Sequence, residues 1–310
     1  MSRYQLQRVN EVILGPLEAH PWESRAAFNP GAVRVDDDIH LLYRAVEGDN
    51  FSTAGYARLN RQGKVLYRHP EPVLRRTLPQ ESKGCEDLRI VPFENRYQIF
   101  YTAYNGSRVR IANAETDDFM SYRKFGLVGP DYTDKDAMIF PQHIGGKIAF
   151  LHRIEPNIQL ALFENMDHFR HPGPDYWPDH LKNLEKHTVM YRQFDWESEK
   201  IGAGPPPILT DRGWLLIYHG VDRNITYRAG AALLEEKNPQ KVIARLPYAI
   251  LEPKRDYEKI GDVNNVVFPQ GIALFDDELQ IYYGGADKVV GLAHGSLKEL
   301  LDALWQHRSE

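Results

Sequence analysis

Short runs of apolar, β-branched and aromatic residues recur along the chain, and polar residues end each run. Each run follows a turn signal such as VDDD or TDRG, and several precede a second apolar stretch such as IQLALFE. This arrangement is typical of β-hairpins. The five runs are IHLLYRAVEGD (39–49), YQIFYTAYNGS (97–107), KIAFLHRIEPN (147–157), GWLLIYHGVDR (213–223) and LQIYYGGADKV (279–289).

The spacing of the runs, roughly 50 to 65 residues, indicates a radially repeated unit of several short strands. The sequence therefore predicts an all-β fold, a five-bladed β-propeller that occupies residues 1–310 as a single domain. A β-sandwich is the alternative, although its turn signals would recur at even spacing without such a repeated run. SLKELLDALW (296–305) predicts a short amphipathic helix at the C-terminus, and WPDHLKNLEKH (177–187) a turn of helix within a loop.

Composition narrows the choice of partner. No apolar run is long enough to cross a bilayer, and the first residues, MSRYQLQRVNEVILG, lack the pattern of a secretory signal. Cys85 is the only cysteine, which suits a reducing compartment, so we expect a cytoplasmic location. The net charge of −5 and the scattered Lys and Arg residues argue against a nucleic-acid surface. We expect a small-molecule partner, with neither nucleic acid nor membrane.

The polar residues that end the runs are candidates for a shared site, because strand ends near the axis of a propeller face one central funnel. Asp87 and Arg89 of KGCEDLRIVPF (83–93) would lie beside them, at the start of the second blade. One such residue alone usually bonds only a neighbouring loop, so it is the recurrence that favours a site. The candidates at the ends of the runs are Arg44, Tyr104, Asn105, His152, Arg153, His219, Asp222 and Asp287.

Residue types limit the chemistry of such a site. The His, Cys and carboxylate residues show no metal-ligand spacing, and the glycines form no phosphate-cradling loop. Acidic neighbours oppose thiolate formation at Cys85. We expect no metal and no cofactor. Carboxylates beside cations, with many Tyr and Trp residues, suit a polyhydroxylated sugar.

Five segments carry a closer resemblance. In order they are KGCEDLRI (83–90), TDKDAMIFP (133–141), FLHRIEP (150–156), KIGAGPPPI (200–208) with WLLIYHGV (214–221), and GDVNNVVFPQG (261–271). They resemble the successive signatures of glycoside hydrolase family 130. That family consists of five-bladed propellers, mainly β-mannoside phosphorylases with some β-mannosidases.

The resemblance implies an inverting phosphorolysis. Asp87 aligns with the general acid, which protonates the glycosidic oxygen through a hydroxyl of the bound mannose. Inorganic phosphate, the co-substrate, attacks the anomeric carbon from the opposite face and yields α-mannose 1-phosphate. Arg153 and His219 align with phosphate contacts, and Arg170 is a third candidate. The expected sugar contacts are Arg44, Glu86, Arg89, Tyr104, Asn105, Lys135, Asp136 and Asp287.

Two departures from the family pattern leave the subfamily open. Leu88 and Asn264 stand where the family usually has proline, which shapes the backbone and takes no part in the chemistry. The linkage and the acceptor sugar are likewise left open, as is a homo-oligomer.

Two alternatives remain at this stage. A β-mannosidase on the same scaffold would need a base among Glu155, Asp222 and Asp287, and a non-catalytic propeller would need no site at all. The retained Arg153 and His219 favour the phosphorylase.

Overall fold

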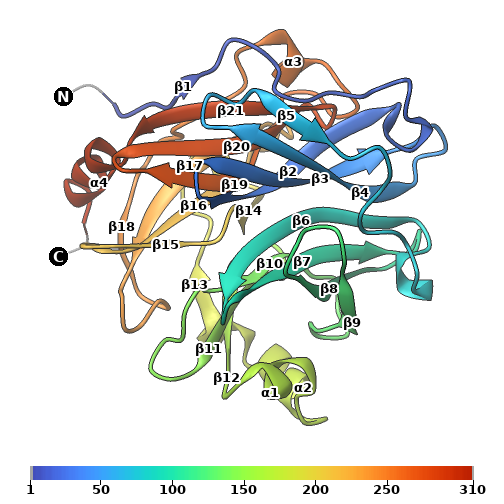
Figure 1. Cartoon of the computed structure of the whole chain (residues 1–310). Coiled ribbons are helices and arrows are strands. Elements are labelled where there is room, and N and C mark those ends of the chain that lie inside the picture. The colour runs from blue at the N-terminus through green and yellow to red at the C-terminus, as the bar shows by residue number, and fades with distance from the viewer. Residues whose placement is uncertain (1–2, 309–310) are drawn as a thin grey trace.

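The computed structural model describes residues 3–308 and arranges the strands in five antiparallel blades (Figure 1). Blade one holds β2 (Ala26–Val35), β3 (Asp38–Val46), β4 (Ser52–Asn60) and β5 (Val65–Arg68), and blade two holds β6 (Gly84–Phe93), β7 (Arg96–Tyr104), β8 (Val109–Thr116) and β9 (Arg123–Leu127). A single parallel bridge between Ser52 and Gly84 joins these two blades into one eight-stranded sheet.

The remaining blades follow in chain order. Blade three holds β10 (Lys135–Ile139), β11 (Ile148–Arg153), β12 (Ile158–Phe163) and β13 (Thr188–Met190). Blade four holds β14 (Lys200–Ala203), β15 (Ile208–Thr210), β16 (Gly213–Val221), β17 (Tyr227–Leu234) and β18 (Val242–Arg245). Blade five holds β19 (Val267–Phe275), β20 (Glu278–Gly285), β21 (Val289–Ser296) and, from the other end of the chain, β1 (Gln7–Arg8).

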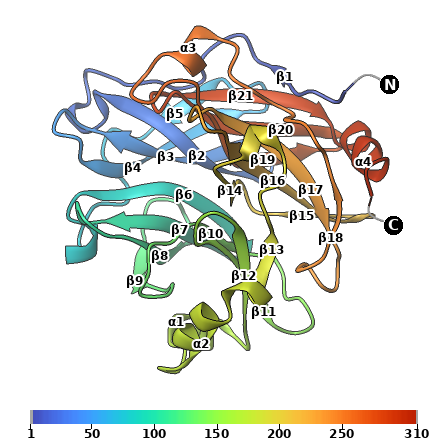
Figure 2. The same ribbon diagram turned by 180° about the vertical axis from the view of Figure 1, so that it is seen from behind.

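The first strand closes the propeller. β1 pairs with β21, so the beginning and end of the described chain share a sheet, and the two strands lie together in both views (Figures 1 and 2). The predicted five-bladed fold is confirmed. The five predicted runs correspond to β3, β7, β11, β16 and β20, each of which is second in the pairing order of its blade. In blade four, β14 and β15 both pair with β16.

Eight short helices occur in the described chain: η1 (Pro21–Glu23), η2 (Pro79–Glu81), α1 (Met166–Arg170), α2 (Tyr176–Lys182), η3 (Leu184–His187), η4 (Asp195–Glu197), α3 (Asp256–Lys259) and α4 (Leu297–Trp305). The predicted C-terminal helix is α4, where the Ser296 side chain accepts a hydrogen bond from the Glu299 backbone and Leu300 and Leu304 are buried. The predicted helix in the 177–187 loop is α2. No described helix has the length and apolar character needed to cross a membrane.

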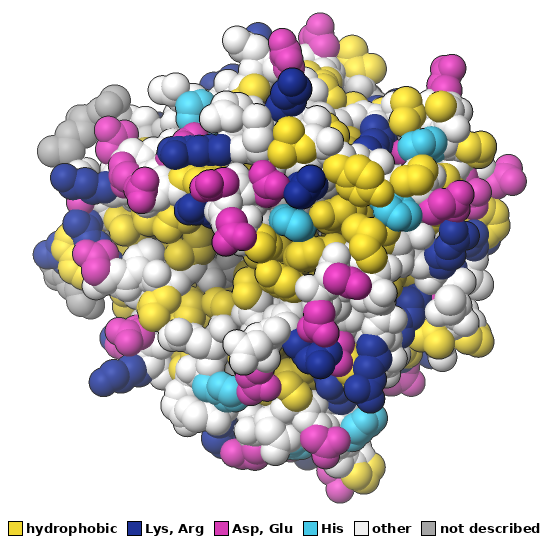
Figure 3. Space-filling model, in the orientation of Figure 1, with side chains coloured by type: hydrophobic (Ala, Val, Ile, Leu, Met, Phe, Trp, Pro, Cys, Tyr) yellow, Lys and Arg dark blue, Asp and Glu magenta, His cyan; other side chains and the backbone are white. Residues whose placement is uncertain are grey.

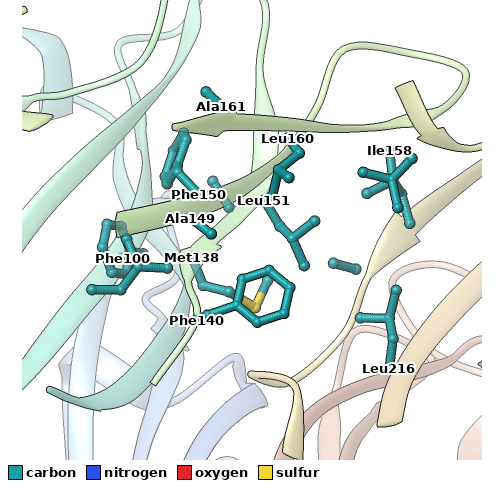
Figure 4. Packing of buried hydrophobic residues seen from close by; sticks show 14 of the residues in the cluster. Phe100, Met138, Phe140, Ala149, Phe150, Leu151, Ile158, Leu160, Ala161 and Leu216 are labelled. Carbon is teal, nitrogen blue, oxygen red and sulfur yellow. The ribbon is translucent and has the colours of Figure 1, made fainter. Parts of the chain in front are cut away.

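The largest apolar core joins neighbouring blades. Figure 4 shows Phe150 and Leu151 of β11 packed near Met138 of β10 and Phe100 of β7, with Leu216 of β16 close by. Burial of these side chains between blades two, three and four fixes the blades against one another. The face shown in Figure 3 mixes acidic and basic side chains without a continuous basic stripe.

The inner strands share an irregularity that shapes the centre of the propeller. The pairing register shifts within β2, β6 and β10, next to residues with positive φ: Asn29 (46°), Asp87 (53°) and Asp136 (53°). Asn and Asp tolerate this left-handed conformation better than most residues, and a bulge redirects the side chain that it carries. Three polar side chains are thereby placed at one level of three blades.

A buried Glu cluster recurs in four blades. Each cluster joins a Glu with no exposed surface to a Tyr hydroxyl of the second strand and to an Arg or Lys. The four sets are Glu23 with Tyr43 and Arg68, Glu81 with Tyr101 and Lys124, Glu197 with Tyr218 and Arg245, and Glu258 with Tyr283 and Arg8. Because a buried carboxylate is costly unless it is paired and hydrogen-bonded, these contacts stabilise the clusters as units.

Candidate active site

A cavity of about 210 Å³ lies where the blades meet. Its lining includes Arg44 from blade one, Asp87 from blade two, Arg153 from blade three, His219 from blade four and Asp287 from blade five. The structure therefore brings together one predicted site residue from every blade. Lys135 and Asp136, also predicted, line the same cavity.

Asp87 lies in the first of two groups of polar side chains in the cavity. Its Oδ1 accepts a hydrogen bond from Asn29 Nδ2 at 2.8 Å and lies 3.5 Å from Arg44 Nη1. Its Oδ2 lies 4.0 Å from Lys135 Nζ. We call Asn29, Arg44, Asp87 and Lys135 the acid group.

The acid group holds Asp87 in its ionised form. Burial alone would raise the pKa of Asp87, but Arg44, Lys135 and the hydrogen bond from Asn29 together lower the pKa below its ordinary value. Asp87 is only 5% exposed, so these cations are its main source of stabilisation. In the free protein the carboxylate therefore carries no proton at neutral pH.

The second group gathers on blades three and four. Glu155 Oε1 lies 2.9 Å from Arg153 Nη1 and 2.8 Å from Lys200 Nζ, so two cations converge on one carboxylate oxygen. Asp136 Oδ2 lies 2.8 Å from Arg153 Nε and 3.5 Å from His219 Nε2. We call Asp136, Arg153, Glu155, Lys200 and His219 the cation group.

Burial and neighbouring charges set the protonation states in the cation group. Burial would raise the pKa of Asp136, but Arg153, His219 and Arg89 hold that pKa well below its usual range. Burial lowers the pKa of His219 to about 3, because the attraction of Asp136 does not offset desolvation and the nearby Arg153. His219 is therefore a neutral hydrogen-bonding group, whereas Arg153 and Lys200 supply positive charge.

Glycine at position 202 allows this close packing. Gly202 pairs with His219 across β14 and β16. A Cβ atom there would lie 2.4 Å from Asp136 Oδ2 and 2.5 Å from His219 Cε1, well inside contact distance. The first glycine of KIGAGPPPI is thus required for space at the cavity.

Several polar atoms at the cavity are poised for a ligand. Asn29 Oδ1, Asp136 Oδ2, Arg153 Nε and His219 Nδ1 are buried and have no hydrogen-bond partner among the described residues. Arg153 Nε and Asp136 Oδ2 are close enough to form an ion pair but are not aligned for a hydrogen bond. Since unpaired buried polar atoms are costly, their concentration here favours a site that binds a polar molecule.

Asp287 stands apart from both groups. It lies in the turn between β20 and β21 with a φ of 52° and lines the cavity. Burial raises the pKa of Asp287 to about 6, an effect that Arg44 opposes and Asp87 reinforces. The cavity thus holds two carboxylates, Asp87 and Asp287, whose pKa values are shifted in opposite directions.

Two predicted sugar contacts lie behind the cavity wall. Glu86 is buried and accepts a hydrogen bond from Arg44 Nη2 at 2.8 Å. Arg89, 1% exposed, donates to the carbonyls of Ala203 and Gly204 and to Asp136 Oδ1. Neither residue is part of the cavity lining, and their contacts support the lining residues and join blades two, three and four.

Tyr104, Asn105 and Arg170, predicted as site residues, lie outside the cavity lining. The Asn105 side chain accepts from the backbone of Arg108 in the turn after β7, and the Tyr104 hydroxyl donates to the Gly106 carbonyl. Arg170 of α1 pairs with Glu115 at 3.1 Å on the outer part of blade two. A polar residue at a strand end, or an Arg close to one in the sequence, therefore does not necessarily line the cavity. Its position in the strand pairing also has to match that of the lining residues.

Asp222 and His152 are likewise held elsewhere. Asp222 accepts hydrogen bonds from Arg228 and from backbone N–H groups of its own turn. His152 is fully buried within blade three.

Asn29, Lys200, Tyr227 and Phe268 line the cavity but were not among the predicted site residues. Lys200 begins KIGAGPPPI, so its signal was present in a segment already singled out. Asn29 precedes a proline in β2, and only the comparison of its bulge with those at Asp87 and Asp136 reveals its role.

The two departures from the family pattern fall in different places. Leu88 has no exposed surface and packs in the core of blades one and two. Asn264 lies in the loop between α3 and β19, whose Val263 and Val266 line the cavity. Only the second change reaches the cavity wall.

Comparison with known proteins adds independent findings. A family model described as beta-1,4-mannooligosaccharide phosphorylase matches residues 5–306. A 1,2-beta-oligomannan phosphorylase from Thermoanaerobacter sp. (strain X514) is 37% identical over 310 residues, covering 96% of this chain and 99% of the relative. A beta-1,2-mannobiose phosphorylase from the same organism is 37% identical over 308 residues, covering 94% of this chain and 97% of the relative.

A solved structure agrees with the fold. The beta-1,2-mannobiose phosphorylase from Listeria innocua, in complex with beta-1,2-mannobiose, superposes with a TM-score of 0.84 at 25% identity. The match covers 97% of this chain and 99% of that one.

Proposed function

The chain belongs to glycoside hydrolase family 130, and we propose that it cleaves a terminal β-mannoside with inorganic phosphate, with inversion, to α-mannose 1-phosphate and a shortened sugar. The sequence-based prediction of a β-mannoside phosphorylase is confirmed by the family match and by the activities in the names of its relatives. The residue roles below are proposals that rest on the geometry of the cavity.

The observation that carries the proposal is the convergence of Arg153 and Lys200 on Glu155 Oε1, in the cavity that also holds Asp87. An anionic oxygen already lies between the two cations, so the place suits a phosphate oxygen. The side chain of Glu155 is 54% exposed, so solvent can take up its carboxylate when a phosphate oxygen displaces it. A guanidinium fork, an ammonium group and a neutral imidazole together provide charge and directed hydrogen bonds for a dianion.

We assign the proton transfer to Asp87. Phosphorolysis breaks the bond between the anomeric carbon and the glycosidic oxygen, and one phosphate oxygen takes its place. Monohydrogen phosphate gives up its proton as the sugar phosphate dianion forms, and the departing oxygen gains one, so the overall reaction consumes no proton. Asp87 therefore has to relay a proton and does not have to supply one.

Phosphate binding prepares Asp87 for this role. Asp87 is ionised in the free protein and must gain a proton before it donates. A dianion bound in the same cavity raises the pKa of Asp87 by like-charge repulsion, which favours the protonated acid once both substrates are present. A second carboxylate acting on water is unnecessary, because phosphate is itself a nucleophile that has only to be held.

The sugar is bound by the rest of the cavity. The rings of Tyr227 and Phe268 offer apolar faces for a pyranose, and Asp287, Lys135 and Arg44 offer partners for its hydroxyls. We propose β-1,2-linked mannosides as the first substrates to test, because both Thermoanaerobacter relatives carry that linkage in their names.

The deciding experiment incubates the protein with β-1,2-mannobiose, β-1,4-mannobiose and mannosyl-glucose, each with and without phosphate. We expect mannose 1-phosphate only when phosphate is present, and most of it from the β-1,2 disaccharide. Release of free mannose at the same rate in both conditions would identify a β-mannosidase, with Glu155 or Asp287 as the base available in the cavity. No turnover of any of the three sugars contradicts the proposal.

A further inference from the structure

Blade three replaces the Glu cluster of the other blades with a chain of imidazoles. The clusters of the other four blades use a Tyr of the second strand, and the residue that follows this Tyr is Arg44, Thr102, His219 or Gly284. In blade three the corresponding pair is His152 and Arg153. Arg153 pairs with Lys135 just ahead of the bulge in β10, as Arg44 pairs with Phe28 ahead of the bulge in β2, so the positions are equivalent. His152 thus stands where a Tyr is expected.

The partners of His152 are also different. His152 Nδ1 lies 2.8 Å from Asp134 Oδ2, and His152 Nε2 lies 3.0 Å from His180 Nε2. Asp134, His152 and His180 are 1%, 0% and 3% exposed, so none of them is a surface contact. The ring of His180 stacks on that of His187 with centroids 4.2 Å apart.

The inner end of the chain holds the backbone of Arg153. Asp134 Oδ1 accepts the backbone N–H of Arg153 at 3.0 Å, while its other oxygen is held by His152. The strand pairing of β10 with β11 shifts between Lys135 and Met138, right beside this contact. The Asp134 carboxylate therefore fixes the backbone of Arg153 where the pairing of the two strands is irregular. This contact sets the position from which the Arg153 side chain extends.

The outer end of the chain lies on α2. Residues 164–187, which contain α1 and α2, connect β12 to β13, whereas the equivalent connections in blades one, two and four are 61–64, 117–122 and 235–241. Figure 1 shows α1 and α2 projecting beyond β12. His180 is the buried residue of α2, so the inserted segment sends a polar side chain inward to His152.

We propose that Asp134, His152 and His180 form a positioning unit for Arg153, which sets the affinity for phosphate and links it to the inserted helix α2. The proposal rests on the proposed function, because it takes Arg153 as a phosphate contact. None of the three residues lines the cavity, so they act through Arg153 and are not catalytic residues.

A matched pair of variants separates positioning from simple packing. Asn at position 152 keeps a polar atom near the place of Nδ1 and can retain the bond to Asp134, whereas Gln reaches the place of Nε2 and loses that bond. We expect His152→Gln to raise the Michaelis constant for phosphate about tenfold, the scale of a lost hydrogen bond to a charged group. The constant for mannobiose should change less than about twofold in either variant. His152→Asn keeps the bond to Asp134 but loses the contact with His180, so its constant for phosphate should rise only about threefold.

The control variant is Tyr101→Phe. It removes a buried hydroxyl at the equivalent position of blade two, where the next residue, Thr102, does not line the cavity. It should lower the melting temperature and leave the Michaelis constant for phosphate unchanged. Should His152→Gln fail to fold, His180→Asn at the outer end provides the same measurement, with an expected rise of about threefold.

Direct phosphate binding, measured by calorimetry on the same variants, tests the proposed function and the positioning unit separately. A parent protein that binds phosphate but releases free mannose overturns the proposed function and leaves the comparison of dissociation constants as the test of the positioning unit. Equal effects on phosphate and sugar, or a loss of melting temperature alone, overturn the positioning unit. A parent that binds no phosphate overturns both.

Discussion

The acid group and the cation group use the same residue types in opposite arrangements. In the acid group, cations from blades one and three surround a buried carboxylate, Asp87. In the cation group, Arg153 and Lys200 hold a carboxylate, Glu155, whose side chain is half exposed. The acid group fixes the Asp87 carboxylate in place, because that side chain is buried. The cation group holds the Glu155 carboxylate at the surface of the cavity, where a phosphate oxygen can replace it.

This difference separates the two tasks of a phosphorylase within a single cavity. Under the proposed function, Asp87 of β6 in blade two handles the proton, and residues of blades three and four hold the nucleophile. Arg89 connects the two groups, because it donates to the Asp87 carbonyl and to Asp136 Oδ1. Substitutions in one group should therefore affect turnover, and substitutions in the other should affect phosphate affinity.

The largest effect is expected in the acid group. Asp87→Asn keeps the size of the side chain and removes the transferable proton, so turnover should fall by about 10² or more, the usual range for general acid catalysis. Phosphate affinity should not fall and should rise modestly, because the variant removes the repulsion between the Asp87 carboxylate and the bound dianion. The measurements are steady-state kinetics and phosphate calorimetry. A folded variant nearly as active as the parent would exclude Asp87 as the acid.

A second prediction concerns the cation group. Arg153→Ala should weaken phosphate by about 1.5 to 3 kcal/mol, the scale of a hydrogen bond to a charged group, and should affect the mannoside far less. Arg153→Lys restores the charge but not the paired hydrogen bonds, so it should recover only part of the loss. The synthetic direction, from mannose 1-phosphate and an acceptor sugar, should weaken in parallel. A Michaelis constant for phosphate equal to that of the parent would remove Arg153 from the anion site.

The sequence predicted the fold from one strand in each blade. The second strands are buried and apolar, and polar residues end them, so their period is visible in the chain. Arg44, Arg153 and His219 occupy equivalent register positions in three of these strands, which is why recurrence pointed to them. The recurring Glu-Ser of PWESR, PQESK and DWESE marks three of the buried clusters and is a second repeat that the prediction did not use.

The limits of the prediction have a structural cause. The inner strands carry bulges, and a bulge breaks the alternation from which the direction of a side chain is inferred. Asn29 and Lys200 were missed because their strands are irregular or short. Tyr104, Asn105 and Arg170 were chosen by type and nearness to strand ends, whereas the structure places them in a turn and on an outer helix.

The smallest effect tests the carboxylate that belongs to neither group. Burial raises the pKa of Asp287 from 3.8 to about 6, so the folded protein binds more protons here than the unfolded chain between these two pH values. The parent should therefore lose stability, relative to Asp287→Asn, as the pH rises from about 4 to about 6, and the difference should stay constant above that range. At pH 7 we expect the Asn variant to be more stable by about 1 kcal/mol, after allowance for the exposed part of the side chain. Below about pH 4 the two proteins should be equally stable, because both side chains are then neutral.

Denaturant unfolding of both proteins across this range measures the effect, and mannoside turnover of the Asn variant should fall if Asp287 binds a sugar hydroxyl. A stability difference that does not vary with pH would show that the charge of Asp287 costs the folded protein nothing, and the contrast with Asp87, whose charge Arg44 and Lys135 stabilise, would be lost.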